Sequence, residues 1–423
     1  MKLSAFGDKF ANESGITTLM DDLGHALASG SDMIMMGGGN PAHIPEVEKR
    51  LRGRLQTVLE SKSDFRRLIG IYDPPQGEQS FIVAVRDLLN RQYGWNLKTE
   101  NIALTNGSQA AFFMLFNLFG GAFSDGSSKQ IQLPLAPEYI GYADAGLEHA
   151  FFKANRPEIE LIDTTTFKYH VDFSKLAITE NTGAICVSRP TNPTGNVLTD
   201  SEMARLNSLA IQHDVPLIVD GAYGSPFPNL IFSEARPFWN DNTIMCLSLS
   251  KFGLPAARTG IVIAREDVVQ ALSGVNAILN LATGSFGSMM AYDLVKSGEI
   301  ISLSNEVIRP FYLEKAKRAE DSLREKLAGL PFRLHKVEGA MFLWLWLEGC
   351  PVDSQRLYER LKSKGVLVVP GQHFFLGLDE PEDREWAHRD ECIRITYSQD
   401  PALVEKGLAI IAEEVRSAYS TQP

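Results

Sequence analysis

The sequence predicts an α/β fold, with a mostly parallel central sheet flanked by helices, together with a smaller α+β domain. In the middle of the chain, short apolar runs bounded by turn residues alternate with longer helical stretches, which is typical of βαβ units in a parallel sheet. After about residue 297 the pattern changes to a long amphipathic helix, expected over 305–326, and then to short strand candidates. At 423 residues the chain exceeds the size at which one hydrophobic core usually keeps growing, so two parts are expected.

The domain boundaries follow from this change of pattern. We expect a large domain over 45–296 and a small domain that combines 1–44 with 297–423. No Gly/Ser-rich linker, low-complexity tract or internal repeat separates the two parts. The strand candidates of the small domain are the runs 332–335, 340–347, 366–369 and 392–397.

Composition argues against several functional classes. The formal charge is 41 − 52 = −11, and no run of lysine and arginine supplies the basic patch that a nucleic acid would need. The N-terminus lacks the apolar core of a signal peptide, and the run 340–347 is too short to cross a bilayer, so a cytoplasmic protein without membrane contact is expected. The four cysteines form no CxxC pair and the eight histidines show no HxxxH spacing, so we expect reduced core thiols and no metal site.

The ends of the strand candidates indicate where a ligand binds. Five apolar runs of the large domain each end in a polar turn: 102–105, 131–135, 184–188, 215–219 and 244–247. In open α/β sheets, ligands bind outside the carboxyl ends of the strands. The runs therefore deliver five side chains to one rim, those of Ser108, Tyr139, Asn192, Asp220 and Lys251.

The first two strand ends suit a phosphate and a flat ring. The turn 106–109 lies at the mouth of a helix, where free backbone amides, a hydroxyl and the positive helix end can meet an anion. An ordinary N-cap is the alternative for this turn. Tyr139 can stack on a flat ring, or it can be a core aromatic with a satisfied hydroxyl.

The next two strand ends suit a pyridine ring. A carboxylate such as Asp220, held against the ring nitrogen, keeps that nitrogen protonated and makes the ring a better electron sink. Asn192 and Tyr223 can donate hydrogen bonds to a ring phenolate. The alternatives are a capping or turn aspartate and a plain Asn-Pro-Thr-Gly turn over 192–195.

Lys251 supplies the group with which an aldehyde cofactor would react. Lysine can condense with a carbonyl to form a Schiff base, while Ser248 and Arg258 can hold a phosphate by hydrogen bonds and charge. A Ser-Lys pair at a solvated strand end is the alternative. Arg394 lies in an apolar C-terminal strand, so it needs a partner, either an internal carboxylate or the carboxylate of a substrate.

Taken in order, these motifs resemble the fold-type-I pyridoxal-phosphate aminotransferases of class I/II. The resemblance covers nearly the whole chain and rests on the stretches 72–77, 106–109, 192–195, 220–223 and 248–251, with Arg258 and Arg394. It implies pyridoxal 5′-phosphate as cofactor, amino acids and 2-oxo acids as substrates, and a homodimer with shared active sites. One departure is that Arg258 lies seven residues after Lys251, whereas many relatives place it eight after.

The resemblance also implies roles toward the cofactor. Lys251 would form the Schiff base and carry the proton, Asp220 would pair with the ring nitrogen, and Tyr223 would bind the phenolic oxygen together with Asn192. Tyr139 would stack on the ring. The residues implied to hold the phosphate are Gly107, Ser108, Gln109, Ser248, Arg258 and, from the neighbouring subunit, Tyr72.

On the substrate side, the resemblance implies a clamp for the α-carboxylate. Arg394 would bind that group beside Asn192 and the loop that contains Gly39 and Asn40. Enzymes for small neutral amino acids such as valine and alanine, which need no second arginine, are resembled by the stretches 6–10, 14–16, 37–41, 136–146 and 231–237. Apolar residues that could line a side-chain pocket are Ile16, Met35 and Met36, although methionines at such spacing are more often core.

Several alternatives share part of this pattern. An aminotransferase for other neutral amino acids, or a lyase or synthase on the same scaffold, would keep every cofactor contact. A regulator with an aminotransferase-like domain would need a DNA-binding extension, and residues 1–40 are too short and insufficiently basic for one. A dinucleotide-dependent oxidoreductase would need a GxGxxG at the first strand-helix turn, which is absent.

Overall fold

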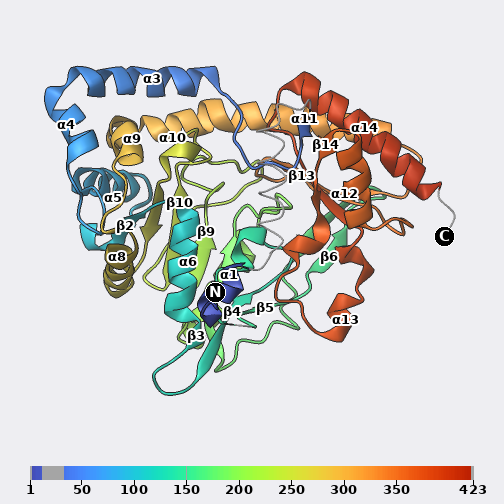
Figure 1. Ribbon diagram of the computed structural model, residues 1–423, viewed down its shortest axis with the longest axis horizontal. Helices are drawn as coiled ribbons and strands as arrows, with labels where there is room; N and C mark the ends of the chain where they lie inside the picture. Colours follow the sequence, from blue (N-terminus) through green and yellow to red (C-terminus); the bar gives the residue numbers. More distant parts are fainter. Residues whose placement is uncertain (1, 12–32, 149, 421–423) are drawn as a thin grey trace.

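A computed structural model describes residues 2–11, 33–148 and 150–420 of the chain. Two sheets lie side by side, with helices around them (Figure 1). The five strands expected from apolar runs are all present, and all belong to the larger sheet. The predicted α/β class is therefore confirmed.

The larger sheet is mostly parallel. Its order is β2 (Ile102–Thr105), β11 (Gly260–Ile263), β10 (Thr243–Ser248), β9 (Leu217–Asp220), β8 (Thr182–Ser188), β4 (Ser128–Leu133) and β3 (Gly121–Ala122), with β5 (Phe152–Ala154) also paired to β4. The pairs β10–β9, β9–β8, β8–β4 and β4–β5 are parallel, whereas β11 is antiparallel to both neighbours. Every residue of β2, β8, β9, β10 and β11 is buried, as expected for strands covered on both faces.

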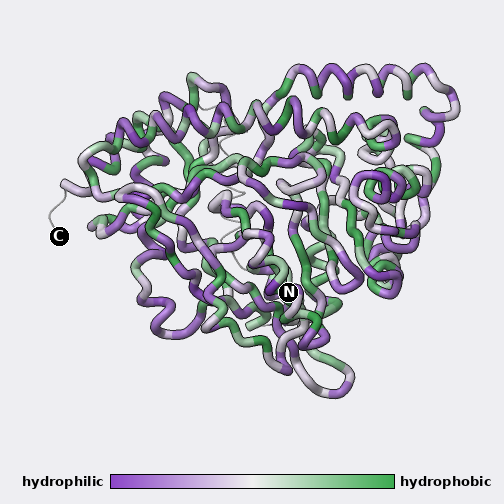
Figure 2. Tube along the Cα trace, turned by 180° about the vertical axis from the view of Figure 1, so that it is seen from behind, coloured by the Kyte–Doolittle hydropathy of each residue, from purple (hydrophilic) through white to green (hydrophobic). Residues whose placement is uncertain are grey.

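Seven helices of eight residues or more accompany this sheet in the described part of the chain. They are α3 (Pro45–Glu60), α4 (Lys62–Gly70), α5 (Gln79–Tyr93), α6 (Ser108–Phe119), α7 (Asp200–Gln212), α8 (Glu266–Asn280) and α9 (Phe286–Ser297). The start of α7 has a clear sequence signal, because Thr199 and Glu202 form a capping box there. The α6 helix is apolar nearly throughout because it packs against the sheet, whereas α3 is hydrophilic along its outer face (Figure 2).

The second sheet has six strands. Its order is β15 (Val369–Pro370), β16 (Cys392–Thr396), β13 (Phe342–Trp346), β12 (Arg333–His335), β7 (Thr166–His170) and β6 (Glu158–Leu161). A separate pair joins β1 (Ile34–Met35) to β14 (Val366–Leu367). The strands β6 and β7 come from inside the range 45–296, so this sheet draws on both predicted domains, and the division at 44/45 and 296/297 stays a prediction.

The long helix expected over 305–326 is interrupted near its start. A π-helical turn over Leu303–Ile308 precedes α11 (Arg309–Lys326), and Pro310 lies in the first turn of α11. Proline has no backbone N–H to donate, so the regular helical hydrogen-bond pattern cannot run through this position. The remaining helices of this half are α12 (Ser354–Ser363) and α14 (Pro401–Tyr419), with short turns α10 (Glu299–Ser302) and α13 (Pro381–Arg384).

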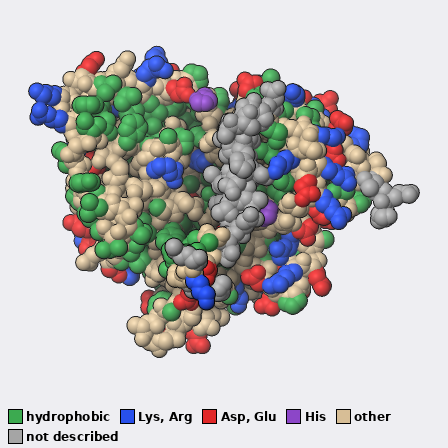
Figure 3. All heavy atoms as spheres, viewed as in Figure 1, with side chains coloured by type: hydrophobic (Ala, Val, Ile, Leu, Met, Phe, Trp, Pro, Cys, Tyr) green, Lys and Arg blue, Asp and Glu red, His purple; other side chains and the backbone are tan. Residues whose placement is uncertain are grey.

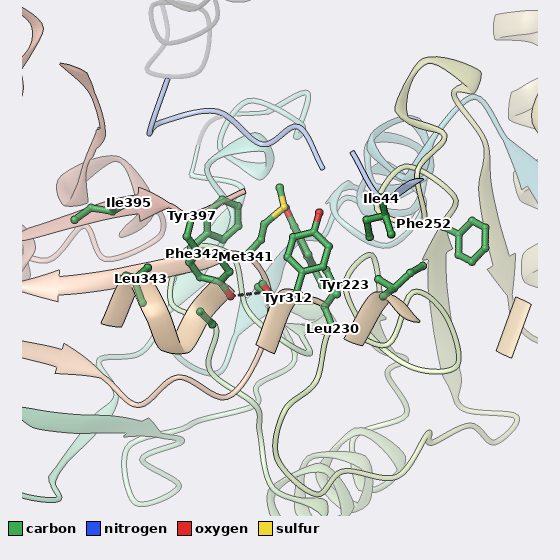
Figure 4. Close-up of a cluster of buried hydrophobic side chains, with 14 of the residues drawn as sticks. Ile44, Tyr223, Leu230, Phe252, Tyr312, Met341, Phe342, Leu343, Ile395 and Tyr397 are labelled. Carbon is green, nitrogen blue, oxygen red and sulfur yellow. Dashed lines mark hydrogen bonds between the residues drawn. The ribbon is translucent and has the colours of Figure 1, made fainter. Parts of the chain in front are cut away.

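One apolar core cluster contains residues of both halves. Figure 4 shows part of it, with Tyr223, Leu230 and Phe252 from the first half of the chain and Met341, Phe342 and Tyr397 from the second. Cys186, Cys246 and Cys392 are buried free thiols, as predicted, whereas Cys350, also expected in the core, is half-buried. Within the described residues, no helix is long and apolar enough to cross a membrane, and no group of three metal-ligating side chains occurs.

Candidate active site

A cavity of about 930 Å³ opens where the strands of the larger sheet end. It collects nearly all of the predicted site residues in one lining: Gly39, Asn40, Ser108, Gln109, Tyr139, Asn192, Asp220, Tyr223, Ser248, Lys251, Arg258 and Arg394. Five of these side chains follow five different parallel strands, as the rim argument predicts. Arg394 comes from β16, so the second sheet closes the cavity.

The amino end of α6 forms a cradle with Arg258. The helix begins at Ser108, and Gly107 precedes it with a left-handed φ of +87°. A Cβ atom at Gly107 would overlap the guanidinium of Arg258, so only glycine lets this side chain lie over the helix end. Arg258 is itself left-handed, at φ +46°, and donates from Nη1 to Oγ of Ser250 at 3.3 Å. Unpaired helix amides and a guanidinium together suit a phosphate.

Ser248 and Ser250 complete this cradle. Ser248 is buried, and its Oγ accepts a hydrogen bond from the backbone nitrogen of Ser250 at 3.1 Å. Both serines line the cavity. Ser250 was not selected from the sequence, although its position directly before Lys251 and its hydroxyl were a usable signal.

Asp220 sits at the end of β9 and is 8% exposed. Its Oδ1 accepts from the backbone nitrogen of Ala222 at 2.8 Å, and its Oδ2 accepts from the hydroxyl of Tyr142 at 2.6 Å. Burial raises the pKa of Asp220, while these hydrogen bonds and the charge of Lys251 oppose that rise. Tyr142 was not selected from the sequence. It is the second tyrosine of the stretch 137–142, in which Tyr139 was chosen.

Lys251 lies in the turn after β10 and reaches across the cavity. Its Nζ donates to the carbonyl oxygen of Gly39 and lies 5.3 Å from the ring centroid of Tyr223. Burial, together with the positive charges of Arg394 and Arg258, lowers the pKa of Lys251 to about 8. A lysine with a lowered pKa is a better nucleophile and a better base near neutral pH.

Arg394 is a buried cation without an acidic partner in the described part of the chain. It is 3% exposed, and it donates from Nη1 to Oδ1 of Asn192 and from Nη2 to the carbonyl of Gly37, each at 2.6 Å. Its Nε has no hydrogen-bond partner among the described residues. The guanidinium lies 4.3 Å from the ring centroid of Phe342 and 5.2 Å from that of Phe374. Such a buried charge calls for an anion as ligand.

Tyr139 borders the cavity close to Asp220. Its ring packs edge-on against Tyr142, with centroids 5.3 Å apart, and the backbone of Gly141 passes so close that a Cβ there would overlap the ring. The side chain of Gln109 donates to the carbonyl of Gly141 at 2.7 Å, which fixes this loop to the start of α6.

Four further predictions have mixed outcomes. Met35 lines the cavity, but Met36 does not: it is fully buried against Gly407 of α14, because β1 turns this side chain into the core. Ile16 lies outside the described residues. Tyr72 is 82% exposed and is not part of the cavity of its own chain.

The fold and the site together define a fold-type-I pyridoxal-phosphate enzyme. A family model described as "Aminotransferase class I and II" matches residues 54–411. The chain belongs to this family, whose cofactor is pyridoxal phosphate.

Relatives cover the whole chain. It is 49% identical over 420 residues to valine–pyruvate aminotransferase of Escherichia coli, which spans 99% of both sequences. A solved valine-pyruvate aminotransferase from Salmonella typhimurium is 47% identical, covers 96% of this chain and 100% of its own, and has a TM-score of 0.88. At 20% identity and a TM-score of 0.79, an α-aminoadipate aminotransferase from Thermus thermophilus has the same fold over 99% of this chain and 98% of its own; its structure holds a phosphopyridoxyl-leucine.

The residues of the cavity fit pyridoxal phosphate. The cradle of α6, Arg258 and the two serines suits the phosphate, and Asp220 suits the ring nitrogen. Asn192 accepts from Arg394 through Oδ1, so its Nδ2 group is available as a donor.

Proposed function

We propose that this chain transfers the amino group between valine and pyruvate, giving alanine and 2-oxoisovalerate, in a ping-pong cycle. The observation that carries this proposal is that Lys251 and Arg394 line the same cavity, the first a reactive amine and the second a buried cation with no acidic partner among the described residues. The identity of 49% to the valine–pyruvate aminotransferase of E. coli supports the choice of substrates.

Bound pyridoxal phosphate supplies an aldehyde that condenses with amino groups and a ring that withdraws electrons from Cα. In our proposal Lys251 tethers the cofactor, Asp220 pairs with the ring nitrogen, and Asn192 and Tyr223 donate to the phenolic oxygen. The phosphate is held by Gly107, Ser108, Gln109, Ser248 and Arg258, with Ser250 supporting Arg258 through its hydroxyl. Tyr139 covers one side of the ring.

Lys251 also moves the proton. With a pKa of about 8, its amine is partly unprotonated at neutral to mildly alkaline pH and can take a proton from Cα of the substrate. The carbonyl of Gly39 accepts a hydrogen bond from Nζ and so orients the amine within the cavity. Lys251 can then return this proton to the cofactor.

Arg394 orients the substrate. Its present partners, the amide oxygen of Asn192 and the carbonyl oxygen of Gly37, carry no net charge. A substrate carboxylate would supply the negative charge that neutralises the guanidinium. Two donors on a planar group fix both carboxylate oxygens, so Cα is held in one place relative to Lys251. The loop with Gly39 and Asn40 flanks this position.

The lining of the cavity favours a small neutral side chain. Besides Lys251, Arg258 and Arg394, it contains Lys315 and Arg318. Both of these have a partner, because Lys315 donates to the carbonyl of Gln399 at 2.6 Å and Arg318 pairs with Glu314 at 2.9 Å. Neither is held ready for a distal carboxylate of aspartate or glutamate. Met35 adds apolar surface to the lining, which suits the isopropyl group of valine.

A homodimer is part of the proposal. Exposed apolar side chains gather on two neighbouring segments: Leu59, Phe65, Ile69, Ile71 and Tyr72 on the first, and Ile278, Leu279, Leu281 and Phe286 on the second. Asp73 accepts from the hydroxyl of Ser285 at 2.6 Å, which holds the segments together. Hydrophobic side chains are more frequent on the half of the face over α4, α5 and α8 than on the opposite half (Figure 3). A second copy that covers this surface would receive Tyr72 at its phosphate cradle.

A half-reaction experiment tests this function. Purified protein with pyridoxal phosphate should change its visible absorbance when valine is added and recover the starting spectrum when pyruvate follows. A protein whose spectrum responds to aspartate or glutamate but not to valine would contradict the proposed specificity. The Lys251→Ala variant is the control, because it should bind the cofactor yet show no turnover.

A further inference from the structure

Glu138 is a second carboxylate behind the ring-nitrogen side of the cavity. It is 1% exposed, and no salt bridge to it occurs within the described residues. Its Oε1 accepts from the backbone nitrogen of Ser188 at 2.9 Å, and its Oε2 accepts from the Ser188 hydroxyl at 2.7 Å and from the backbone nitrogen of Tyr139 at 3.1 Å. Three donors on one carboxyl group favour its ionised form. A buried carboxylate without a cation needs an explanation beyond packing.

Glu138 and Asp220 each accept a hydrogen bond from a hydroxyl group, of Ser188 and of Tyr142, and these two hydroxyls are in contact. Ser188 and Asp220 are paired neighbours on the parallel strands β8 and β9. The hydroxyl of Tyr142 lies 3.4 Å from Oγ of Ser188 and donates to Oδ2 of Asp220 at 2.6 Å. Glu138, Ser188, Tyr142 and Asp220 thus form one continuous chain of polar groups, of which only Ser188 and Asp220 line the cavity.

We propose that Glu138 is a positioning residue for Asp220: through Ser188 and Tyr142 it holds a second negative charge behind the ring-nitrogen site and so favours the protonated ring nitrogen of the cofactor. This inference rests on the proposed function, since it assumes that Asp220 faces that nitrogen. It assigns a role to a residue that does not touch the cofactor, and to the serine and tyrosine that connect the two carboxylates.

The other ionisable groups around Glu138 leave its charge uncompensated. Tyr142, Cys186 and Tyr139 are neutral near pH 7, because burial raises the pKa of each. Lys251 is the cation that acts on Asp220, and Arg394 acts on Tyr139. A protonated ring nitrogen would add the positive charge that this region lacks.

The ionisation of Glu138 makes the effect depend on pH. Burial raises the pKa of Glu138 to about 7, and the charge of Asp220 adds to that rise. Below pH 7 the protonated carboxyl carries no charge, so it exerts little field on Asp220. Above pH 7 the carboxylate is charged and its support for the protonated ring grows.

The test is to measure ring-nitrogen protonation directly. Wild type and Glu138→Gln are loaded with pyridoxal phosphate carrying ¹⁵N in the ring, and the ¹⁵N chemical shift is followed from pH 6 to pH 9. The variant should match wild type at pH 6 and should lose ring protonation above pH 7, with a midpoint about one pH unit lower, a tenfold change in the protonation equilibrium. Glutamine has nearly the size and shape of glutamate, so a purely packing role of Glu138 would leave the midpoint unchanged.

Ser188→Ala breaks the connection without removing the charge, so it should lower the midpoint by a smaller amount and should reduce the effect of Glu138→Gln in the double variant. Glu202→Gln is the matched control, because Glu202 is another buried carboxylate that accepts backbone hydrogen bonds but lies outside the cavity. Its titration should equal that of wild type.

Identical titrations of wild type, Glu138→Gln and Ser188→Ala would overturn the inference. If Glu138→Gln does not fold, the Ser188→Ala variant becomes the test. A ring-nitrogen titration midpoint equal to that of wild type would then overturn the proposal. The ¹⁵N readout needs no substrate, so it separates this inference from the proposed function. A wild-type protein inactive with valine but sensitive to Glu138→Gln would refute the substrates and keep the role of Glu138.

Discussion

Arg394 on β16 donates from Nη1 to Oδ1 of Asn192, which follows β8, across 2.6 Å. This hydrogen bond joins the second sheet to the loop after β8, and both residues line the cavity. It also ties the residue proposed to bind the substrate carboxylate to a residue proposed to bind the cofactor. A substrate that binds Arg394 is therefore positioned relative to the cofactor, and no loop or domain has to move to bring the two together.

The first prediction concerns this arginine. Arg394→Lys keeps the charge but loses the planar pair of donors, so kcat/KM for valine and for pyruvate should fall roughly 10²-fold or more, consistent with about 3 kcal/mol for one partner of a buried charged pair. Steady-state kinetics measure the loss. Cofactor content, determined by absorbance after denaturation, should stay at the wild-type level. A variant that loses cofactor instead would place Arg394 in the cofactor site.

Gly107 should be intolerant of a side chain. Gly107→Ala adds a Cβ that overlaps the Arg258 guanidinium at a left-handed φ of +87°, so the affinity for pyridoxal phosphate should fall at least tenfold. Titration of the apoprotein with cofactor measures this. Gly53→Ala is the control: Gly53 lies in α3 with no atom near its Cβ position, so alanine should keep cofactor affinity and raise the free energy of unfolding by roughly 0.5–1 kcal/mol. If Gly107→Ala and Gly53→Ala bind pyridoxal phosphate equally tightly, the cradle formed by α6 and Arg258 does not hold the phosphate.

Two buried histidines should make the protein sensitive to acid. Burial lowers the pKa of His335 and of His388 to about 3, while histidine in the unfolded chain titrates near 6.5. Between these values only the unfolded chain takes up the protons, so stability present above pH 6.5 is lost as the pH falls toward 3, by at most ~1.4 kcal/mol per unit for each histidine. Denaturant unfolding from pH 7 to pH 4 measures the slope. His388→Gln should make it shallower, and an unchanged slope would contradict the assignment.

The shared active site can be tested with mixed dimers. Tyr72→Phe should weaken cofactor binding, and Lys251→Ala should abolish turnover. A heterodimer of the two variants contains one site that has both Lys251 and the partner's Tyr72. We therefore expect heterodimers with about half of the wild-type activity, in which the one intact site binds the cofactor as tightly as a wild-type site. If their affinity equals that of the Tyr72→Phe homodimer, Tyr72 serves its own subunit and the proposal is wrong.

Much of the fold could be predicted because the strand signals are local. The runs that became β2, β8, β9 and β10 are apolar over four or more residues and end in polar turns, so their positions and common edge were predictable. The strand β11 was missed because it follows Arg258 closely, with only the 3₁₀ turn Pro255–Ala257 between it and β10. The membership of β6 and β7 in the second sheet depends on pairing with β12, which no local pattern encodes.

Within the site, the residues that the sequence analysis did not select are ones that hydrogen-bond to other side chains of the site. Ser250, Tyr142 and Glu138 were passed over because each lies beside a more conspicuous residue, and their importance depends on distances across the fold. Ser188 and Asp220 are 32 positions apart in sequence but adjacent in the sheet. Met35 and Met36 were left open between pocket and core, because the sides to which β1 and the residue after it point are set by the pairing of β1 with β14.

The most direct test of the proposed function is the transfer of labelled nitrogen. Wild-type protein with pyridoxal phosphate is incubated with ¹⁵N-valine and unlabelled pyruvate, and the products are followed by mass spectrometry. We expect ¹⁵N-alanine and 2-oxoisovalerate in equal amounts, with no labelled ammonia and no product from Lys251→Ala. Labelled ammonia without labelled alanine would identify a lyase-type reaction and would contradict amino-group transfer between valine and pyruvate.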